Sequence, residues 1–175
     1  MTRIPLVTTR DGLRPEQRAV FDAVAPIRGI VRGPFGVLLH RPAIAAGAEE
    51  IGGYLRYRGL LPPTLREAVI LSVARMWSCQ FEWTAHRKLG LEAGLDRTTL
   101  AQIEDRRFGE LSGDIGLAVE FAQTLTQMHE VPPDLFSRVG RRWNVDEQVE
   151  LAALIGYYTF LAVVLNAFDV TPVVS

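Results

Sequence analysis

The sequence predicts an all-α protein, and three features of its 175 residues support this fold class. Apolar residues recur with helical spacing along most of the chain, and no stretch alternates apolar and polar residues clearly enough to form a strand. Prolines stand where helices are expected to begin, and glycines stand where they are expected to end. The connections are short and none is of low complexity, so we expect one domain over residues 1–175.

Each expected helix carries its own start or stop signal. Pro15 opens the first helix, because the N–H group of a residue in the first turn has no hydrogen-bond partner within the helix and its absence costs nothing. Gly59 and Gly94 each end a helix, since glycine adopts a left-handed conformation at little cost. Residues 33–42 form a loop that holds a short helical turn. Helices are expected at about 15–25, 42–58, 62–77 and 79–93, directly after 96, at 113–129, from 133, and at 146–168.

The composition gives no reason to expect a nucleic acid or a membrane as a partner. Lys and Arg number 19 and Asp and Glu number 20, so the net charge is −1 and no basic surface is expected. Cys79 is the only cysteine, which rules out an internal disulfide and fits a reducing cytoplasm. The N-terminal residues lack the apolar core of a secretion signal. We therefore expect a cytoplasmic protein.

One segment, residues 151–168, contains no charged side chain and is nearly long enough to span a bilayer. A helix that is apolar on all sides can equally be buried in a protein core or in a subunit interface. Because the rest of the composition is balanced, burial is favoured over a membrane span. Five aliphatic side chains of the segment are therefore expected to be buried: Leu151, Leu154, Ile155, Leu161 and Leu165.

A degenerate internal repeat with a spacing of 80 residues relates the two most apolar helices. Residues 65–71 align with residues 145–151, and the same register places His86 opposite Asn166. In the second copy, no carboxyl, thiol or imidazole side chain stands at the positions that correspond to His86 and the polar residues around it. If the repeat is real, the active site is therefore expected in the first copy alone.

Three side chains that can do chemistry share one face of the helix expected at 79–93, namely Cys79, Glu82 and His86. At 100° per residue, Glu82 lies within about 60° and His86 within about 20° of Cys79 around the helix axis. Glu82 and His86 are also an i,i+4 pair and can touch. Because a neighbouring carboxylate favours the charged imidazole, His86 is a candidate general acid or base near neutral pH.

Structural roles for the same residues stay open on spacing alone. A single histidine is usually a surface or satisfied core residue, and a single cysteine usually packs as a small apolar side chain. Thr64 and Glu67 have the spacing of a capping box, with Thr64 as the N-cap. Asn144 and Glu147 have the same spacing before the last helix. Glu67 is therefore explained either by a helix start or by a role beside His86.

The order of several short motifs resembles one superfamily. Glu67 with its apolar helix, followed by EWTAH at 82–86 and LEAGL at 91–95, is similar to the carboxymuconolactone decarboxylase and alkylhydroperoxidase D superfamily. Looser similarity is found at residues 33–35, 39–42, 54–58, 151–158 and 165–168. The resemblance implies an alkylhydroperoxidase D-like helical bundle that assembles as a homo-oligomer, either a trimer or a hexamer. The apolar surfaces of the last helix and of residues 68–77 are a physical reason to expect the same.

Two branches of this superfamily require different chemistry. In the alkylhydroperoxidase branch, a Cys-x-x-Cys pair precedes the histidine and an upstream glutamate completes a proton relay. Cys79, His86 and Glu67 match these positions, but Glu82 stands in place of the second cysteine. One sulfur cannot close the disulfide that a dithiol peroxidase needs. The redox alternative is therefore a sulfenate cycle of Cys79 with an external thiol.

The decarboxylase branch resembles the chain better, because it carries Glu-x-x-x-His at this place and needs no sulfur. Its members remove carbon dioxide from a carboxylated lactone of aromatic catabolism and shift a double bond. By this resemblance His86 transfers the proton, Glu82 orients it and Glu67 completes a relay, with no metal or cofactor implied. Three further residues are expected to bind the substrate: Arg75, Arg41 and Trp83.

The leading prediction is an acid–base enzyme acting on a small carboxylic acid or lactone. Its alternatives are a thiol-dependent, peroxidase-like redox protein using Cys79 and a helical scaffold that has lost catalysis. The relay requires Glu67, Cys79, Glu82 and His86 to converge on one cavity, although Glu67 lies on the preceding helix.

Overall fold

The computed structural model describes residues 2–28 and 31–172, which form helices and connecting loops without a strand. This confirms the predicted all-α class. The helices are α1 (Pro15–Arg28), α2 (Pro34–Leu38), α3 (Pro42–Tyr57), α4 (Pro63–Met76), α5 (Gln80–Glu92), α6 (Arg97–Glu104), the 3₁₀ turn η1 (Phe108–Glu110), α7 (Gly113–Met128), α8 (Pro133–Arg142) and α9 (Val145–Ala167).

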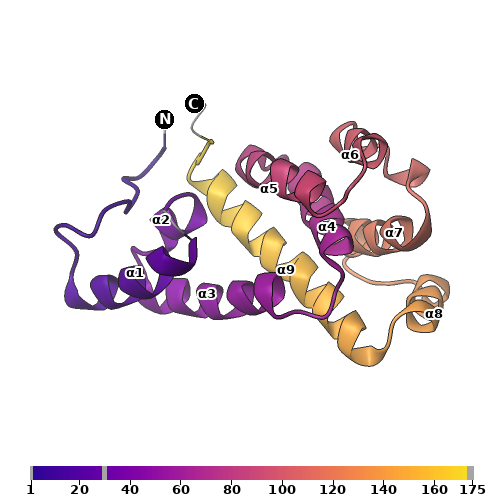
Figure 1. Cartoon of the computed structure of the whole chain (residues 1–175), viewed down its shortest axis with the longest axis horizontal. Helices are drawn as coiled ribbons and strands as arrows, with labels where there is room; N and C mark the ends of the chain where they lie inside the picture. The colour runs from indigo at the N-terminus through magenta and orange to yellow at the C-terminus, as the bar shows by residue number, and fades with distance from the viewer. Residues whose placement is uncertain (1, 29–30, 173–175) are drawn as a thin grey trace.

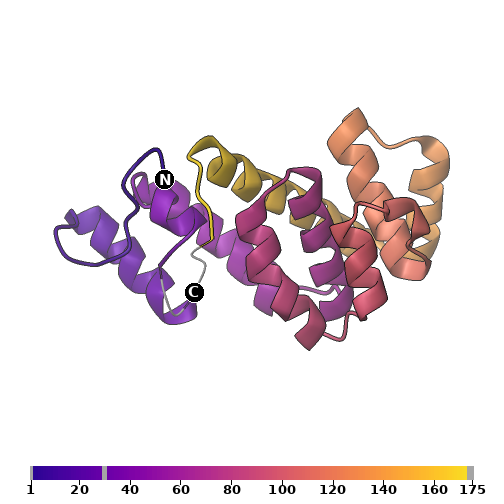
Figure 2. The same ribbon diagram turned by 90° about the horizontal axis from the view of Figure 1, so that it is seen from above.

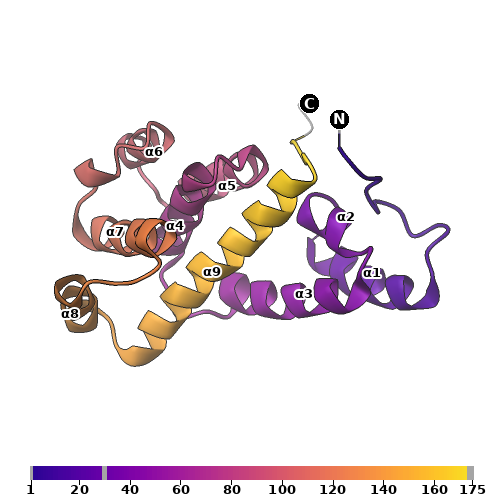
Figure 3. The ribbon, with the colours of Figure 1, turned by 180° about the vertical axis from the view of Figure 1, so that it is seen from behind.

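Helix α9 runs through the middle of the fold. In Figure 1 it crosses the molecule diagonally, with α1, α2 and α3 on one side and α4 to α8 on the other. It packs against α2 and α3 on the first side and against α4, α7 and α8 on the second. Figures 2 and 3 show from two further directions that the first three helices extend away from the rest, which makes the molecule elongated.

Most helices begin and end within a few residues of their predicted positions. Prolines open α1, α2, α3, α4 and α8, as expected from their fixed φ angle and missing N–H group. The predicted capping box before the last helix is confirmed, because the side chains of Asn144 and Glu147 bond reciprocally to each other's backbone N–H groups. The turn η1 was not predicted, since three residues are too few to show a periodic pattern.

Helix α4 begins earlier than its capping-box pattern suggests. Pro62 is the N-cap and Pro63 the first helical residue, because the fixed φ of a proline suits that position. Thr64 therefore lies inside the first turn, where its hydroxyl donates a hydrogen bond to the carbonyl of Ala93 at the end of α5. The predicted box of Thr64 and Glu67 is wrong, and the Glu67 carboxyl is available for another contact.

The five aliphatic side chains expected to be buried in α9 are all buried. By length and composition alone α9 could also cross a membrane, but half of its most apolar window is buried inside the protein. The side chains of α4 from Glu67 to Ala74 are all buried as well. Of the two apolar helices, α9 is therefore the one that keeps a large uncovered apolar face.

The internal repeat does not extend to the shape of its two copies. After α4 the chain turns at Ser78, whose φ of +50° is left-handed, and α5 then folds back antiparallel to α4. The aligned residues 157–159 instead continue α9 without interruption to Ala167. Only the first copy thus forms a helical hairpin.

Candidate active site

The helical hairpin of α4 and α5 brings Glu67 and His86 together. Gly90 lies one turn beyond His86, and a Cβ atom there would stand 3.0 Å from a methyl group of Leu71 on α4. The absence of a side chain therefore lets the two helices approach closely. Leu71 and Leu95 occupy the space that a side chain at Gly90 would need.

Glu67 and His86 form a buried pair in direct contact. The Oε2 atom of Glu67 lies 2.7 Å from Nδ1 of His86, and both side chains are buried. Burial on its own raises the pKa of Glu67, but the hydrogen bond from His86 and the charges of His86, Arg66 and Arg56 outweigh it, so the pKa lies below its ordinary value. Glu67 is therefore a carboxylate, which only accepts hydrogen bonds, and Nδ1 of His86 carries the proton.

The second ring nitrogen of His86 faces two other polar groups. Its Nε2 atom lies 3.5 Å from Oε2 of Glu82 and 3.4 Å from the hydroxyl of Tyr158 on α9. The Tyr158 ring also meets the imidazole edge-on, with ring centroids 5.2 Å apart. Burial, followed by the nearby Glu82 charge, raises the pKa of Tyr158 well above its ordinary value, so this hydroxyl stays protonated.

Tyr158 was missed by sequence reasoning. It lies 72 residues after His86, on a helix that carries none of the predicted site residues. The available signal was a pair of tyrosines, Tyr157 and Tyr158, in a largely apolar helix. A hydroxyl in such a helix needs a hydrogen-bond partner, and for Tyr158 that partner is His86.

A cavity of about 310 Å³ opens onto His86, Glu82 and Tyr158. Its apolar walls come from α2, α5 and α9, and it is large enough for a small organic molecule. Three cationic residues line it together with two glutamates: Arg32, Arg56, Lys88, Glu82 and Glu92. Arg56 is half-buried, and its positive charge acts on both the Glu67 carboxyl and the Tyr158 hydroxyl. Because Lys88 lies 3.4 Å from Glu92, Arg32 and Arg56 are the cations at this cavity that favour an anionic ligand.

Cys79 does not join the other three predicted catalytic residues. It is the N-cap of α5 and is only 1% exposed, packed in an apolar cluster with Val37, Ala162 and Leu165. Burial raises the pKa of its thiol to about 11. Helical spacing placed Cys79 near the His86 face, but a cap residue lies outside the regular helix and its side chain points to α2 and α9 instead. Glu67, Glu82 and His86 converge without it.

The three residues predicted to bind substrate also lie away from the His86 cavity. Arg41 is exposed at the start of α3 beside a separate cavity lined by Arg14 and His40. Trp83 is buried in the core between α4, α6 and α7, because it points to the opposite face of α5. The Arg75 guanidinium lies over its ring at 5.3 Å. The arginines at the cavity are Arg32 and Arg56 instead.

We expect the Glu67–His86 pair to make stability depend on pH. Because the folded-state pKa of Glu67 is lowered, its contribution is complete above the pKa of an unfolded glutamate, about 4.3, and is lost as pH falls through the folded value. Glu67→Gln should therefore destabilise the protein at pH 6 and progressively less toward pH 3. Urea unfolding at both pH values measures this, with the exposed Glu130→Gln as control. A difference that stays constant with pH would contradict it.

No group of three or more His, Cys, Asp or Glu side chains within residues 2–28 and 31–172 is arranged to hold a metal ion. The polar groups around His86 are instead two carboxylates and a phenol within 3.5 Å of one imidazole. Such a set can hold, donate and accept a proton beside a small bound anion. The fold and the site thus define a class: an all-helical protein with a buried histidine–carboxylate pair beside a cavity.

Comparison with known proteins supports the resemblance indicated by the sequence over part of the chain. Residues 42–107, which include Glu67, Glu82 and His86, match the model of the carboxymuconolactone decarboxylase family. No curated protein matches the chain. The helical bundle is an alkylhydroperoxidase D-like fold, as the following solved structures show.

Solved structures match the chain over nearly its whole length at low identity. The alkylhydroperoxidase AhpD core of an uncharacterized peroxidase-related protein from Ralstonia eutropha JMP134 has a TM-score of 0.79 at 19% identity, covering 98% of this chain and 92% of its own. An uncharacterized peroxidase-related protein from Silicibacter sp. TM1040 has a TM-score of 0.76 at 17% identity, and the match covers 98% of this chain and 91% of that protein. A cysteine-to-alanine variant of the debrominase Bmp8, in complex with 2,3,4-tribromopyrrole, has a TM-score of 0.72 at 14% identity. That match covers 100% of this chain and 93% of the debrominase.

Proposed function

We propose that this protein is an acid–base enzyme of the carboxymuconolactone decarboxylase type, which decarboxylates or isomerises a small carboxylic acid or lactone. The observation that carries the proposal is the buried Glu67–His86 pair, whose second ring nitrogen faces a cavity with three cationic residues. A cytoplasmic location, expected from the single cysteine, is part of the proposal.

In the proposed reaction His86 moves the proton. With Nδ1 donating to the Glu67 carboxylate, the neutral ring presents the lone pair of Nε2 to the cavity. The carboxylate stabilises the imidazolium that forms when Nε2 removes a proton from carbon next to a carbonyl. Returning that proton at another carbon shifts the double bond. Decarboxylation requires Nε2 to take up a proton from solvent beforehand: carbon dioxide then leaves, its bonding electrons stay as an enolate, and the imidazolium gives that proton to carbon.

The remaining cavity residues fit this chemistry. Arg56 and Arg32 are the groups that would hold the carboxylate of the substrate, since guanidinium binds carboxylate through paired hydrogen bonds. The protonated hydroxyl of Tyr158 would stabilise negative charge developing on the substrate oxygen. Glu82 would orient His86 from the cavity side.

The redox alternative rests on Cys79, and the surroundings of this residue disfavour it. The reactive form of cysteine is the thiolate, and a thiol with a pKa of about 11 is ionised at pH 7 to only about one part in 10⁴. Cys79 is also buried and is not among the residues lining the His86 cavity. Similarity to peroxidase-related structures below 20% identity supports the fold and not the reaction.

The proposal is tested by incubating the protein with small carboxylated lactones and β,γ-unsaturated acids. Ultraviolet absorbance follows the double-bond shift, and a coupled bicarbonate assay follows release of carbon dioxide. Turnover of one of these compounds supports the proposal. Absence of turnover together with reduction of organic peroxides would favour the redox alternative, and absence of both would favour a catalytically silent scaffold.

Cys79→Ser should retain at least about half of the wild-type kcat, because acid–base chemistry at His86 does not use sulfur. The substitution changes one atom at a buried position, so thermal unfolding must show that the variant is folded at the assay temperature. Loss of kcat by 100-fold in a folded Cys79→Ser variant would instead assign the chemistry to the thiol.

A further inference from the structure

Arg66 directly precedes Glu67 on α4, and its side chain is more buried than is usual for an arginine. This side chain is 17% exposed, whereas those of Arg10 and Arg138, which form ion pairs at the surface, are 56% and 44% exposed. Burying a charged group costs free energy unless an opposite charge lies close to it. The burial of Arg66 therefore requires a partner of negative charge.

That partner is the Glu67 carboxylate. Nε of Arg66 lies 3.6 Å from Oε1 of Glu67, while Oε2 lies 2.7 Å from Nδ1 of His86. In the described part of the chain Arg66 meets no other carboxylate within 4.0 Å. Consecutive residues of a helix do not face each other, so helical spacing alone does not produce this contact. The two oxygens of Glu67 thus have different partners, one an arginine and the other a histidine.

The contact between Arg66 and Glu67 is one of charge. The Nε–H group of Arg66 is buried, and among the described residues it donates no hydrogen bond. A nearby cation stabilises the ionised form of a carboxyl group relative to the protonated form. Burial raises the pKa of Glu67, but the hydrogen bond and charge of His86, with the charges of Arg66 and Arg56, bring it below its ordinary value.

Arg66 and Arg56 differ in their relation to the His86 cavity. Arg56 lines the cavity, whereas neither Arg66 nor Glu67 does. A substrate carboxylate bound at Arg56 would neutralise much of that charge and bring a second negative charge toward Glu67. Arg66 is then the cation that still favours ionised Glu67 while the cavity is filled.

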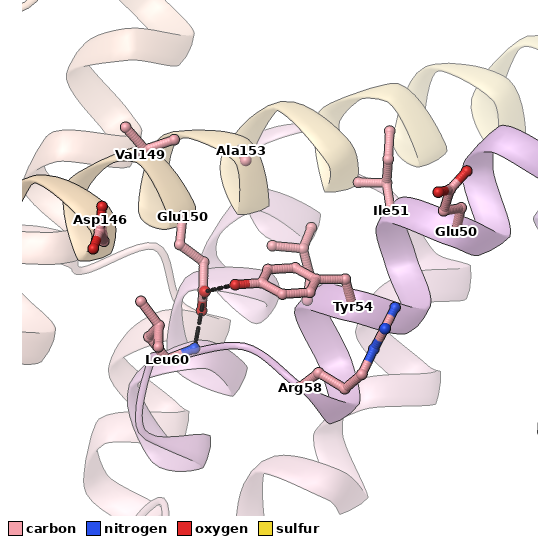
Figure 4. A pocket seen from close by; sticks show the side chains of 10 residues that line it. Glu50, Ile51, Tyr54, Arg58, Leu60, Asp146, Val149, Glu150 and Ala153 are labelled. Carbon is pink, nitrogen blue, oxygen red and sulfur yellow. Dashed lines mark hydrogen bonds between the residues drawn. The ribbon is translucent and has the colours of Figure 1, made fainter.

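The segment that joins α3, which carries Arg56, to α4, which carries Arg66, is held against α9. The Glu150 carboxylate accepts hydrogen bonds from the backbone N–H of Leu60, at 2.7 and 2.8 Å, and from the Tyr54 hydroxyl, at 3.3 Å (Figure 4). A Cβ atom at Gly59 would stand 2.5 Å from this carboxylate, so only glycine fits there. These contacts fix the end of α3 and the approach to α4, and with them the two cations near Glu67.

We propose that Arg66 is a positioning residue, which keeps Glu67 ionised and directed at Nδ1 of His86 while a proton is transferred at Nε2. This inference rests on the proposed acid–base function, in which the Glu67 carboxylate stabilises the imidazolium that forms on His86. Arg66 itself touches neither the substrate nor the reacting nitrogen, since it does not line the cavity.

Urea unfolding between pH 3 and pH 7 tests the inference without a substrate. The stability lost on Glu67→Gln falls as pH falls through the folded-state pKa of Glu67, which Arg66 helps to lower. In an Arg66→Gln background the same fall should therefore occur at a pH higher by at least about half a unit. Arg66→Lys keeps the charge and should leave this midpoint near its wild-type position.

Arg75→Gln is the matched control. Arg75 is also half-buried on α4, and its Nε atom is likewise buried without a hydrogen bond among the described residues. Its guanidinium lies over the Trp83 ring, however, and its charge is not among those that lower the pKa of Glu67. The substitution should lower stability without moving the midpoint for Glu67→Gln.

Kinetics add a second readout on any substrate that the wild-type protein turns over. Arg66→Gln should lower kcat about 10-fold and change KM by less than about twofold, since Arg66 does not line the cavity. Arg66→Lys should recover most of the lost kcat. A rise in KM at unchanged kcat would assign Arg66 to substrate binding and contradict the inference.

The unfolding series can overturn the inference by itself. An unchanged midpoint in a folded Arg66→Gln variant would do so, as would an equal change in Arg75→Gln. A midpoint that moves as far in Arg66→Lys as in Arg66→Gln would show that the shape of Arg66 matters and not its charge. If no compound is turned over, the proposed function fails, while the unfolding series still decides whether Arg66 keeps Glu67 ionised.

Discussion

Replacing His86 with glutamine should lower kcat by about 10²–10⁴-fold on any substrate that the wild-type protein turns over, which is the range for loss of a general acid or base. Glutamine keeps a polar group of similar reach beside Glu67, but it neither accepts nor donates a proton at working pH. The expected loss is in kcat more than in KM, because binding of the substrate carboxylate is assigned to Arg56 and Arg32. Steady-state kinetics at pH 7 measure both constants.

Two controls make the His86→Gln result specific. Tyr158→Phe removes one hydroxyl near Nε2 and should cost less, about 10–10²-fold in kcat, since Glu67 still fixes the imidazole. Circular dichroism and thermal unfolding should show that both variants are folded. A folded His86→Gln variant that keeps more than a tenth of wild-type kcat would remove His86 from the reaction and leave the cavity as a binding site.

Truncating Leu154 to alanine should reduce the free energy of unfolding by about 2–5 kcal/mol, the cost of removing a core leucine. Leu154 is 1% exposed on the inner face of α9, in the core that this helix shares with α3, α4 and α7. The deleted methyl groups leave a cavity that helices packed from several directions cannot close. Urea denaturation followed by circular dichroism gives the loss.

Val163→Ala is the matched control for Leu154→Ala, because Val163 lies on the same helix but is 44% exposed. It should change the free energy of unfolding by less than about 0.5 kcal/mol beyond the helix propensities of the two residues. A loss below 1 kcal/mol for Leu154→Ala would contradict its place in the core. The measurement should be made at several protein concentrations, because self-association on α9 would add to the apparent stability.

Much of the fold could be predicted from the sequence because helices are encoded locally. Prolines and glycines fix where a helix starts and stops, and periodic apolar residues identify it between those points. The start of α4 is the exception: the same few residues offered two competing signals, a proline pair and a capping box, and Pro63 prevailed. The sequence likewise placed Glu82 and His86 one turn apart, since both lie on one helix.

Which of the predicted site residues meet was decided by how the helices pack. The contact of Glu67 with His86 depends on the hairpin at Ser78 and the close approach at Gly90. Tyr158 reaches His86 only because α9 packs against α4. The spacing of residues along the chain does not predict which helices pack together.

The same packing decided which predicted residues are left out. A helical projection shows which side chains share a face, but not what covers that face. Cys79 was placed beside the site by its spacing and is enclosed by α2 and α9. Trp83 is enclosed by the core of α4, α6 and α7. Arg41 lies at a distant cavity, and Arg56 lines the His86 cavity where Arg41 was expected. The sequence alone determined the helices and one face of the site; the tertiary structure selected the members of the site, because contacts between helices depend on every side chain packed between them.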